Sequence, residues 1–397
     1  MTSLRFAHPE PIHPRPRIIP VFLPFHGCPH RCLYCAQHAQ TGSGLSGQHI
    51  ADDPPHASQN LSALETIHAE MVQNLTELAA TGAKNRGIAF YGGTFTALPT
   101  QWQQRFLDTA RTFREDGTIS HIRCSTRPDK AAKAHLRQLR ENGLDMVELG
   151  IQSFEPDVLE QTRRGYTPAS AVQACREVRA SGLELGIQLM PGLPGSGLAG
   201  WLRDVDQTRS LNPNVVRIYP CMVLDGTELG RAYLAGTYRP WSLARTLWAV
   251  SHALVLLWRR AIPVIRIGLA PEQSLFPAIL AGPWHPALGH MAKSHALRDT
   301  IVQAMAGVYQ LHHGLSLDPP PGRSREQPLR AWIPRRFASE FWGHGREHTR
   351  TWHRLGLSKA NVHHWQRPYF MIDLQGRSPK PRQQNLCQRL DSAEGSL

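Results

Sequence analysis

Short apolar runs rich in β-branched residues alternate with longer segments of helical periodicity between residues 18 and 219. In the first long segment, apolar residues recur at Leu61, Leu64, Met71 and Leu75, which would lie on one face of a helix. The short runs predict strands at 18–25, 87–91, 119–124, 146–151, 183–190 and 215–219. The periodic segments predict helices at 61–82, 99–115, 129–142, 155–163, 168–182 and 198–210. Repeated alternation of strand and helix predicts a parallel sheet with right-handed crossovers.

Three cysteines lie directly after the first predicted strand. Cys28, Cys32 and Cys35 form a C-x3-C-x2-C pattern. Iron–sulfur clusters normally have four thiolate ligands, so three cysteines on a 4Fe-4S cluster would leave one iron open. Zinc is the alternative, since it accepts mixed Cys/His sets, although zinc sites more often use two separated pairs of ligands. The candidates for the fourth ligand of such a zinc ion are His26, His30 and His38. In either case the loop lies at a strand's carboxyl end, where barrel and open α/β folds carry their chemistry.

Glycine and amide residues lie at the ends of later predicted strands. Gly92 and Gly93 follow the second strand, and a turn of two glycines brings bare backbone close to whatever lies there. Gln152 follows the fourth strand, and Gln188 lies near the end of the fifth. A buried amide without hydrogen-bond partners is costly, so these two side chains are difficult to explain as core residues.

The cysteine spacing, with the aromatic Tyr34 directly before the third cysteine, resembles the radical S-adenosylmethionine (radical SAM) enzymes. Six further motifs resemble the catalytic subunit of Elongator and its stand-alone bacterial relatives. These are Tyr91-Gly-Gly-Thr-Phe-Thr, Ser125-Thr-Arg-Pro-Asp, Glu148-Leu-Gly-Ile-Gln-Ser, Arg164-Gly-Tyr-Thr, Met190-Pro-Gly-Leu-Pro and Arg217-Ile-Tyr-Pro-Cys-Met-Val-Leu-Asp-Gly-Thr-Glu-Leu. No motif for an acetyl-coenzyme A domain follows them, so the chain is most similar to bacterial relatives that lack the acetyltransferase domain.

This resemblance implies an α/β fold, namely a partial (β/α)6 TIM-like radical SAM barrel with a basic C-terminal extension. It implies an enzyme in which Cys28, Cys32 and Cys35 hold a 4Fe-4S cluster, whose open iron binds S-adenosyl-L-methionine. In this family an electron from the cluster cleaves the sulfonium, and the resulting 5′-deoxyadenosyl radical abstracts hydrogen from a substrate. A reductant such as flavodoxin or ferredoxin is the implied partner.

The resemblance also assigns residues to the cofactor site. Tyr34, Gln152 and Arg164 are expected to be catalytic, with Tyr34 near the adenine. The residues expected to bind S-adenosylmethionine are Gly92, Gly93, Thr94, Ser125, Arg127, Gln152, Arg164 and Gln188. Thr94 replaces the acidic residue that is usual in the family's glycine motif, so we expect its contact to use a hydroxyl or backbone oxygen.

Positive charge is concentrated towards the carboxyl terminus. The 397 residues carry a formal net charge of +13, and residues 321–397 hold 14 Lys/Arg against 6 Asp/Glu, a net +8. Trp332, Trp342, Trp352 and Trp365 are interleaved with this charge, a pattern typical of nucleic-acid contact. A solvated arginine-rich surface is the alternative. Together with the resemblance, the charge favours RNA, in particular tRNA, as substrate.

The expected domains are a flexible lead-in at 1–17, the barrel at 18–260 and the basic extension at 261–397. The lead-in lacks the apolar core of a signal peptide. The most apolar run, 243–258, contains Arg245 and His252 and is shorter than the roughly 20 residues of a membrane span. Seven cysteines, of which four are widely scattered, do not form a secreted disulfide framework. We therefore expect a cytoplasmic protein without a membrane partner.

Two alternatives to an RNA-modifying radical enzyme stay open. One is a radical SAM enzyme acting on a small, porphyrin-like molecule, because coproporphyrinogen III oxidase-like relatives carry a similar set of Gln, Arg and Gly-Leu-Pro residues. The other is a non-catalytic protein that binds zinc and nucleic acid. Colour separates the two metals, since a 4Fe-4S protein is brown and a zinc protein is colourless.

Overall fold

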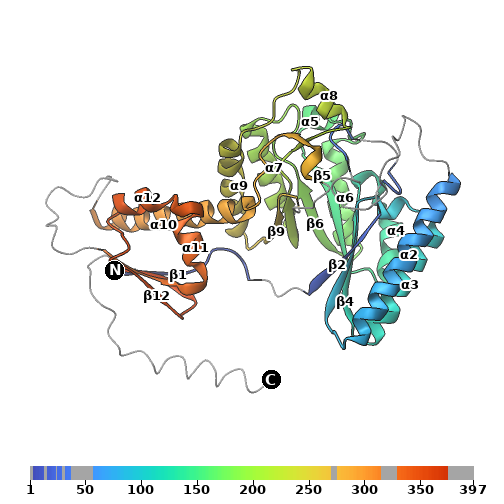
Figure 1. Ribbon diagram of the computed structural model, residues 1–397, viewed down its shortest axis with the longest axis horizontal. Helices are drawn as coiled ribbons and strands as arrows, with labels where there is room; N and C mark the ends of the chain where they lie inside the picture. The colour runs from blue at the N-terminus through green and yellow to red at the C-terminus, as the bar shows by residue number, and fades with distance from the viewer. Residues whose placement is uncertain are drawn as a thin grey trace. The chain divides into compact units, whose positions relative to one another are not determined.

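The structure is a computed structural model, and it describes residues 3–12, 16–23, 25–28, 32–36, 57–269, 275–313 and 329–373. The chain divides into two compact units (Figure 1). Residues 10–292 form the barrel unit, and residues 1–9 and 293–397 form the terminal unit. Helix α10 (Leu288–His313) begins in the barrel unit and continues into the terminal unit.

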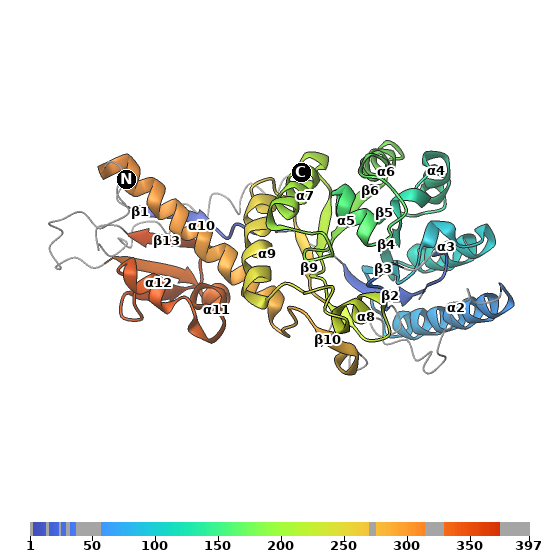
Figure 2. The same cartoon turned by 90° about the horizontal axis from the view of Figure 1, so that it is seen from above.

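A seven-stranded sheet forms the centre of the barrel unit. Its strands, in spatial order, are β2 (Arg17–Phe22), β3 (Arg86–Tyr91), β4 (Ile119–Thr126), β5 (Met146–Gln152), β6 (Glu184–Leu189), β7 (Val215–Ile218) and β9 (Val264–Ile267). Every neighbouring pair is parallel, so all seven carboxyl ends lie at one edge of the sheet. Figure 2 shows the sheet curling into an open half-barrel with helices along its outer side.

The helices of the barrel unit connect successive strands. They are α2 (Ala57–Ala80), α3 (Thr100–Glu115), α4 (Lys133–Glu141), α5 (Pro156–Gln161), α6 (Pro168–Ala180), α7 (Leu198–Leu211), α8 (Glu228–Leu234) and α9 (Leu243–Trp258). Polar side chains mark several starts: Thr167 accepts from Ser170 N at α6, and Ser242 accepts from Arg245 N at α9. Two short strands, β8 (Val223–Leu224) and β10 (Ile279–Ala281), pair antiparallel.

The apolar run at 243–258 is helix α9, and most of its residues are buried in the barrel unit. The carbonyl of Ala249 accepts a hydrogen bond of 2.9 Å from Trp201 Nε1 of α7. Among the helices of the described residues, none combines the length and apolar character that crossing a bilayer requires.

A four-stranded sheet with the order β1-β13-β11-β12 organises the terminal unit. Its elements are β1 (Ser3–Ala7), β11 (Arg330–Pro334), α11 (Ala338–Trp342), α12 (Thr349–Arg354), β12 (Val362–Trp365) and β13 (Tyr369–Asp373), together with α10. The core of this unit lies between the sheet and the helices, where Phe341 stacks on Trp352 with ring centroids 4.4 Å apart.

The predicted partial barrel is confirmed, with all six predicted strands present. The expectation missed β9, which contains only four residues, follows Pro263 and includes Arg266. Because β9 lies beyond residue 260, the barrel extends further along the chain than expected. The helix predicted from residue 129 begins only at Lys133, because Ala132 is extended after a 3-10 turn at Pro128–Lys130.

Two expectations about the chain ends are wrong. The lead-in at 1–17 contains strand β1, which pairs antiparallel with β13. The expectation that the tryptophans among the positive charges contact nucleic acid is wrong for two of them. Trp352 is fully buried and Trp342 packs against the same core, so both are structural. Trp332 and Trp365 are partly exposed, with ring centroids 6.4 Å apart.

The turn after β5 is anchored to α7 by one buried carboxylate. Asp204, 2% exposed, accepts hydrogen bonds from Ser153 Oγ (2.8 Å) and from Phe154 N (2.6 Å). Burial raises the pKa of Asp204 to about 7, although these hydrogen bonds oppose the shift. Ser153 directly follows Gln152, so this anchor holds the strand end that carries a predicted site residue.

We expect Asp204→Ala to lower the free energy of unfolding by about 2 kcal/mol, because it leaves two buried donors without an acceptor. Urea unfolding followed by circular dichroism measures this loss. Asp206→Ala is the matched control on the same helix, since the side chain of Asp206 is 75% exposed and pairs only at the surface with Arg209. Equal stability of the two variants would contradict an anchoring role for Asp204.

Candidate active site

A cavity of about 470 Å³ lies at the edge of the sheet where the strands end. It is lined by all of the predicted site residues, namely Cys28, Cys32, Tyr34, Cys35, Gly92, Gly93, Thr94, Ser125, Arg127, Gln152, Arg164 and Gln188. These residues follow β2, β3, β4, β5 and β6 in turn or lie near the ends of those strands. Parallel pairing therefore brings together residues that are up to 160 positions apart in the sequence.

The cysteine loop and the glycine turn fit against each other. Gly27 has a φ of +73°, and a Cβ on it would overlap the carbonyl oxygen of Thr94. A Cβ on Gly93 would overlap the carbonyl oxygens of Leu23 and His26. In return, Thr94 N donates a hydrogen bond of 2.8 Å to His26 O. Glycine is thus required here for backbone packing, whichever ligand the site binds.

The thiols are held by different partners. Cys28 Sγ lies 3.3 Å from Thr94 Oγ1, within hydrogen-bond distance. Cys32 Sγ accepts a hydrogen bond of 2.9 Å from Arg164 and a longer one of 3.9 Å from Arg127. The backbone of Cys35 donates to Cys32 O at 3.0 Å, closing the turn between them. Cys32 Sγ therefore lies within reach of two arginine side chains.

Arg164 is the central polar contact of the site. Its guanidinium is buried and donates to Cys32 Sγ, to the Tyr34 hydroxyl at 3.1 Å and to the carbonyl of Gly150. Its own carbonyl accepts a hydrogen bond of 2.5 Å from Arg127. Burial raises the pKa of Tyr34 despite the opposing charge of Arg164, so this phenol stays protonated. One side chain therefore joins the cysteine loop to the end of β5.

Tyr34 also has an apolar environment. Its ring is 7% exposed and packs in a cluster with Val158, Leu193 and Leu229. This packing accounts for an aromatic residue at the position, and contact with an adenine ring stays a prediction.

The two glutamines differ in their bonding. Gln188 Nε2 donates to Ser125 Oγ at 3.0 Å and to Glu148 at 3.3 Å. Gln152 has a positive φ of 68°, an unusual conformation for a residue other than glycine. Its Oε1 atom is buried and has no hydrogen-bond partner among the described residues. A buried acceptor that lines a cavity without a partner indicates that a ligand supplies the donor.

A buried charge network beneath this cavity was missed in the sequence. Glu148, fully buried, forms ion pairs with Arg217 (2.6 Å) and Arg123 (3.3 Å) and accepts from the Tyr91 hydroxyl at 3.1 Å. Burial lowers the pKa of Arg217, but Glu148, Tyr219 and Tyr91 together outweigh this and the net shift is upward, so Arg217 stays charged. The signal was present, since Glu148 is the only acidic residue in the otherwise uncharged strand β5.

Other cysteines and histidines lie elsewhere. Cys124, Cys175 and Cys221 are buried and do not line the cavity, and burial raises the pKa of Cys175 and Cys221 to about 12. His26 is buried, and burial lowers its pKa. His30, His38, Cys387 and the predicted loop at 41–55 lie outside the described residues.

The donor set fits a 4Fe-4S cluster with S-adenosylmethionine. The three cysteines are partly exposed and line one cavity, and three is the number that leaves an iron for a further ligand. The unpartnered Gln152 acceptor and the two-glycine turn face the same cavity. They are suited to the polar groups of a bound organic cofactor.

Two protein-family models match the chain. Residues 22–206 match the model of the radical SAM superfamily, and residues 213–298 match the model of the radical SAM C-terminal domain. The tRNA uridine(34) acetyltransferase of Methanocaldococcus jannaschii is 27% identical over 267 residues, which are 60% of this chain and 49% of that protein. Elongator complex protein 3 of Mus musculus is 26% identical over 338 residues, 75% of this chain and 59% of that protein.

The chain therefore spans about half the length of the curated relatives it matches. The solved structure of an archaeal Elp3 from Methanocaldococcus infernus with an N-terminal deletion aligns with a TM-score of 0.51 at 23% identity, covering 59% of each chain. This likeness shows a shared fold. The two family matches together cover well over half of the chain and confirm the enzyme class that the motifs indicated. The chain belongs to the radical SAM superfamily.

Proposed function

We propose that Cys28, Cys32 and Cys35 bind a 4Fe-4S cluster and that the cavity binds S-adenosylmethionine beside it. The observation that carries this proposal is the convergence of all twelve predicted residues on one cavity. When bound, these cofactors supply a 5′-deoxyadenosyl radical, which abstracts hydrogen from a substrate, after an electron arrives from a reductant such as flavodoxin or ferredoxin.

Arg164 positions the cysteine loop in this proposal. Its hydrogen bond of 2.9 Å to Cys32 Sγ lowers the negative charge on that sulfur, and hydrogen bonds to ligand sulfurs tune the potential of such clusters. The same guanidinium is held by Gly150 O and by Tyr34, so it is oriented before any ligand arrives. Preorganised donors of this kind need no rearrangement during the reaction.

The methionine and ribose parts of S-adenosylmethionine have candidate partners on three strands. Gln152 Oε1 accepts from an amino or hydroxyl group, which would satisfy its unpaired buried oxygen. Ser125 and Gln188 already bond to each other at 3.0 Å, so they present a fixed polar wall. The Thr94 hydroxyl already contacts Cys28 Sγ. The amino group of S-adenosylmethionine would therefore contact the backbone of Thr94, Gly92 or Gly93.

The substrate class that we propose is RNA, in particular tRNA. The relatives include proteins named tRNA uridine(34) acetyltransferase, and the chain carries a net charge of +13. In the network beneath the cavity, Arg217 and Arg123 face a single buried carboxylate, so the network keeps one surplus positive charge. Surplus cationic charge attracts a polyanion such as RNA.

A partly exposed aromatic group on the terminal unit supports the same substrate class. Along β11, Ala331 and Ile333 face the core, so Trp332 faces the opposite side. Its ring lies near His363 (5.4 Å) and Trp365 (6.4 Å), and Arg367 lies over the ring of Trp365. Aromatic rings and arginine on one face form a surface on which unpaired bases stack.

For the cofactor chemistry, we expect Cys32→Ala to abolish formation of 5′-deoxyadenosine. The protein is reconstituted anaerobically with iron and sulfide and mixed with S-adenosylmethionine and dithionite, and the product is measured by chromatography. Cys175→Ala is the matched control, because Cys175 is buried in α6 and does not line the cavity. A wild-type protein that stays colourless and takes up no iron on reconstitution would contradict the proposal.

For the positioning role, we expect Arg164→Lys to slow 5′-deoxyadenosine formation at least about tenfold. Lysine keeps the charge but cannot bond to Cys32, Tyr34 and Gly150 at once, and a charge-assisted hydrogen bond contributes about 1.5–3 kcal/mol. The adjacent Arg163→Lys is the control, since the side chain of Arg163 is 61% exposed and pairs with Glu228. Iron content is measured in both variants. Equal rates at equal iron content would argue against Arg164.

For the substrate, we expect tRNA binding that weakens linearly in a plot of log affinity against log salt. Trp332→Ala should lower the affinity about tenfold without changing the salt slope, because it removes stacking and no charge. Trp248→Ala is the control, since Trp248 is 49% exposed on α9. Filter binding measures both quantities. Absence of tRNA binding at low salt would exclude RNA and favour the small-molecule alternative.

A further inference from the structure

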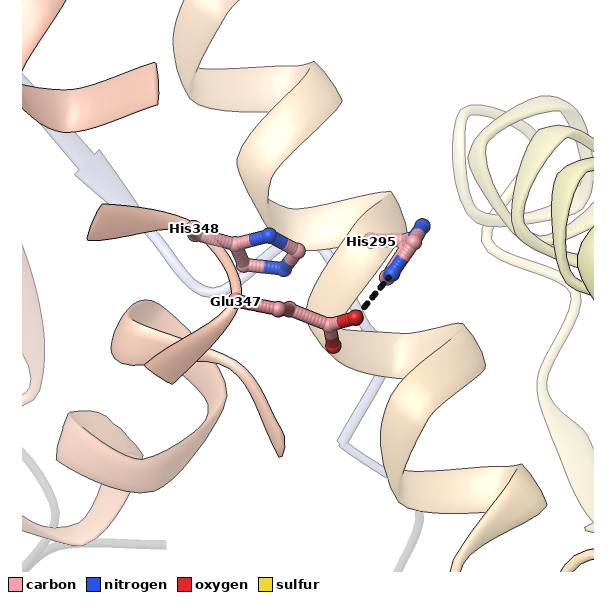
Figure 3. A group of neighbouring side chains, drawn as sticks. All are labelled: His295, Glu347 and His348. Carbon is pink, nitrogen blue, oxygen red and sulfur yellow. Dashed lines mark ion pairs between the residues drawn. The ribbon is translucent and has the colours of Figure 1, made fainter. Parts of the chain in front are cut away.

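Two histidines and a glutamate converge within the terminal unit, in a cluster separate from the cavity of the barrel unit. His295 lies on α10, while Glu347 and His348 lie between the turn at His344–Arg346 and α12. Each side chain offers one ligand atom, and these atoms all lie within 4.8 Å of one another. Figure 3 shows the three side chains turned towards a common space. Among the described parts of the chain, this is the one group of three such residues so close together.

We propose that His295, Glu347 and His348 bind a divalent transition-metal ion, with zinc as the ion. Two imidazole nitrogens and one carboxylate form a three-residue set that zinc accepts, with water in the fourth tetrahedral position. Zinc–ligand bonds of about 2.0–2.2 Å place tetrahedral ligand atoms roughly 3.4 Å apart. The His295 Nε2 and Glu347 Oε2 atoms are already 3.2 Å apart, so small side-chain rotations complete the geometry.

Among the described residues, His295 Nε2 has a carboxylate oxygen at ion-pair distance and no better-aligned partner. His295 Nε2 is buried and, among the residues that the structure describes, has no hydrogen bond of adequate geometry, although Glu347 Oε2 lies at ion-pair distance. Buried polar atoms in proteins nearly always have a partner, and an unplaced ion is one recognised reason for an exception. A metal ion between the imidazole and the carboxylate supplies that partner.

The ligands are held in place by contacts around them. His348 is 1% exposed, and its Nε2 atom lies 3.0 Å from Ser294 Oγ, whose hydroxyl also donates to Glu340 O. Glu347 Oε1 accepts a hydrogen bond of 3.2 Å from His344 N. Such outer contacts orient metal ligands and raise affinity.

Gly343 makes room for two of the ligands. Its φ is +82°, and a Cβ at this position would lie 2.7 Å from Glu347 Cγ and 2.9 Å from His348 Cδ2. Both side chains therefore pack against the backbone of Gly343, in space that the side chain of a larger residue would occupy. Arg298, three residues after His295 on α10, pairs with Asp299 at 2.6 Å and so competes less with a bound cation.

The site joins two segments that are far apart in the sequence. A bound ion ties α10 to the turn that leads into α12, next to the core that contains Trp352. Metal binding of this kind stabilises the folded state by a free energy that grows with the logarithm of the ratio of metal concentration to dissociation constant. We therefore assign the ion a structural role in the terminal unit.

The test uses the full-length chain with Cys28, Cys32 and Cys35 changed to alanine, so that the thiols of the active site cannot take the ion. After chelator treatment and dialysis against micromolar zinc, metal content is measured by mass spectrometry, and affinity by competition with a chromophoric chelator. We expect one zinc per chain, with affinity lowered about 100-fold in His295→Ala and in Glu347→Gln. His353→Ala, an exposed histidine on α12, is the control and should bind normally.

Two further readouts guard against misfolding of a variant. Zinc should raise the melting temperature of the control but not that of Glu347→Gln, which keeps the size of the side chain. Cobalt in place of zinc should give weak visible bands without thiolate charge-transfer absorption. No zinc retained by the parent chain, or equal retention by His295→Ala and Glu347→Gln, would overturn the proposal. Because the cysteines are absent throughout, neither outcome bears on the proposed radical chemistry.

Discussion

The close approach of two backbone turns, 25–28 and 92–94, is the constraint on which the active site depends. Gly27 and Gly93 each occupy a position where a Cβ would overlap a carbonyl oxygen of the other turn, and a hydrogen bond from Thr94 N to His26 O closes the contact. The cysteine loop is therefore placed by backbone packing against the end of β3 and not by its thiols. Backbone packing of this kind orients a loop before any ligand binds.

Arg164 and Glu148 extend this arrangement across the rest of the sheet edge. Arg164 joins Cys32 to the carbonyl of Gly150 on β5, and Glu148 joins β5 to β4 and β7 through two arginines. Removing one partner of such a buried pair leaves an uncompensated charge, which costs more than the pair contributes. The polar groups around the cavity are thus mutually dependent, and this favours one arrangement of the strand ends.

The terminal unit shows a different organisation. Its sheet brings β1, from the start of the chain, beside β13 near residue 370, and its core is dominated by large rings such as Phe341, Trp352 and Phe370. One face of this sheet covers the core. Trp332 and its neighbours lie on the opposite face. The proposed RNA surface and the proposed metal site are both products of this one packing arrangement.

Local pattern in the sequence determined the barrel, because strand and helix periodicity and the residues at strand ends are properties of neighbouring positions. The sequence also predicted which residues lie together, because parallel strands place their carboxyl ends at one edge of the sheet. Cys32, Gln152 and Gln188 could be assigned to one site for this reason. Only the tertiary structure decided that Trp352 is a core residue, that Ser3–Ala7 is a strand, and that Glu148 forms ion pairs with two arginines. Each of these depends on contacts outside its own helix or strand, and a burial pattern made by such contacts leaves no periodic trace in the sequence.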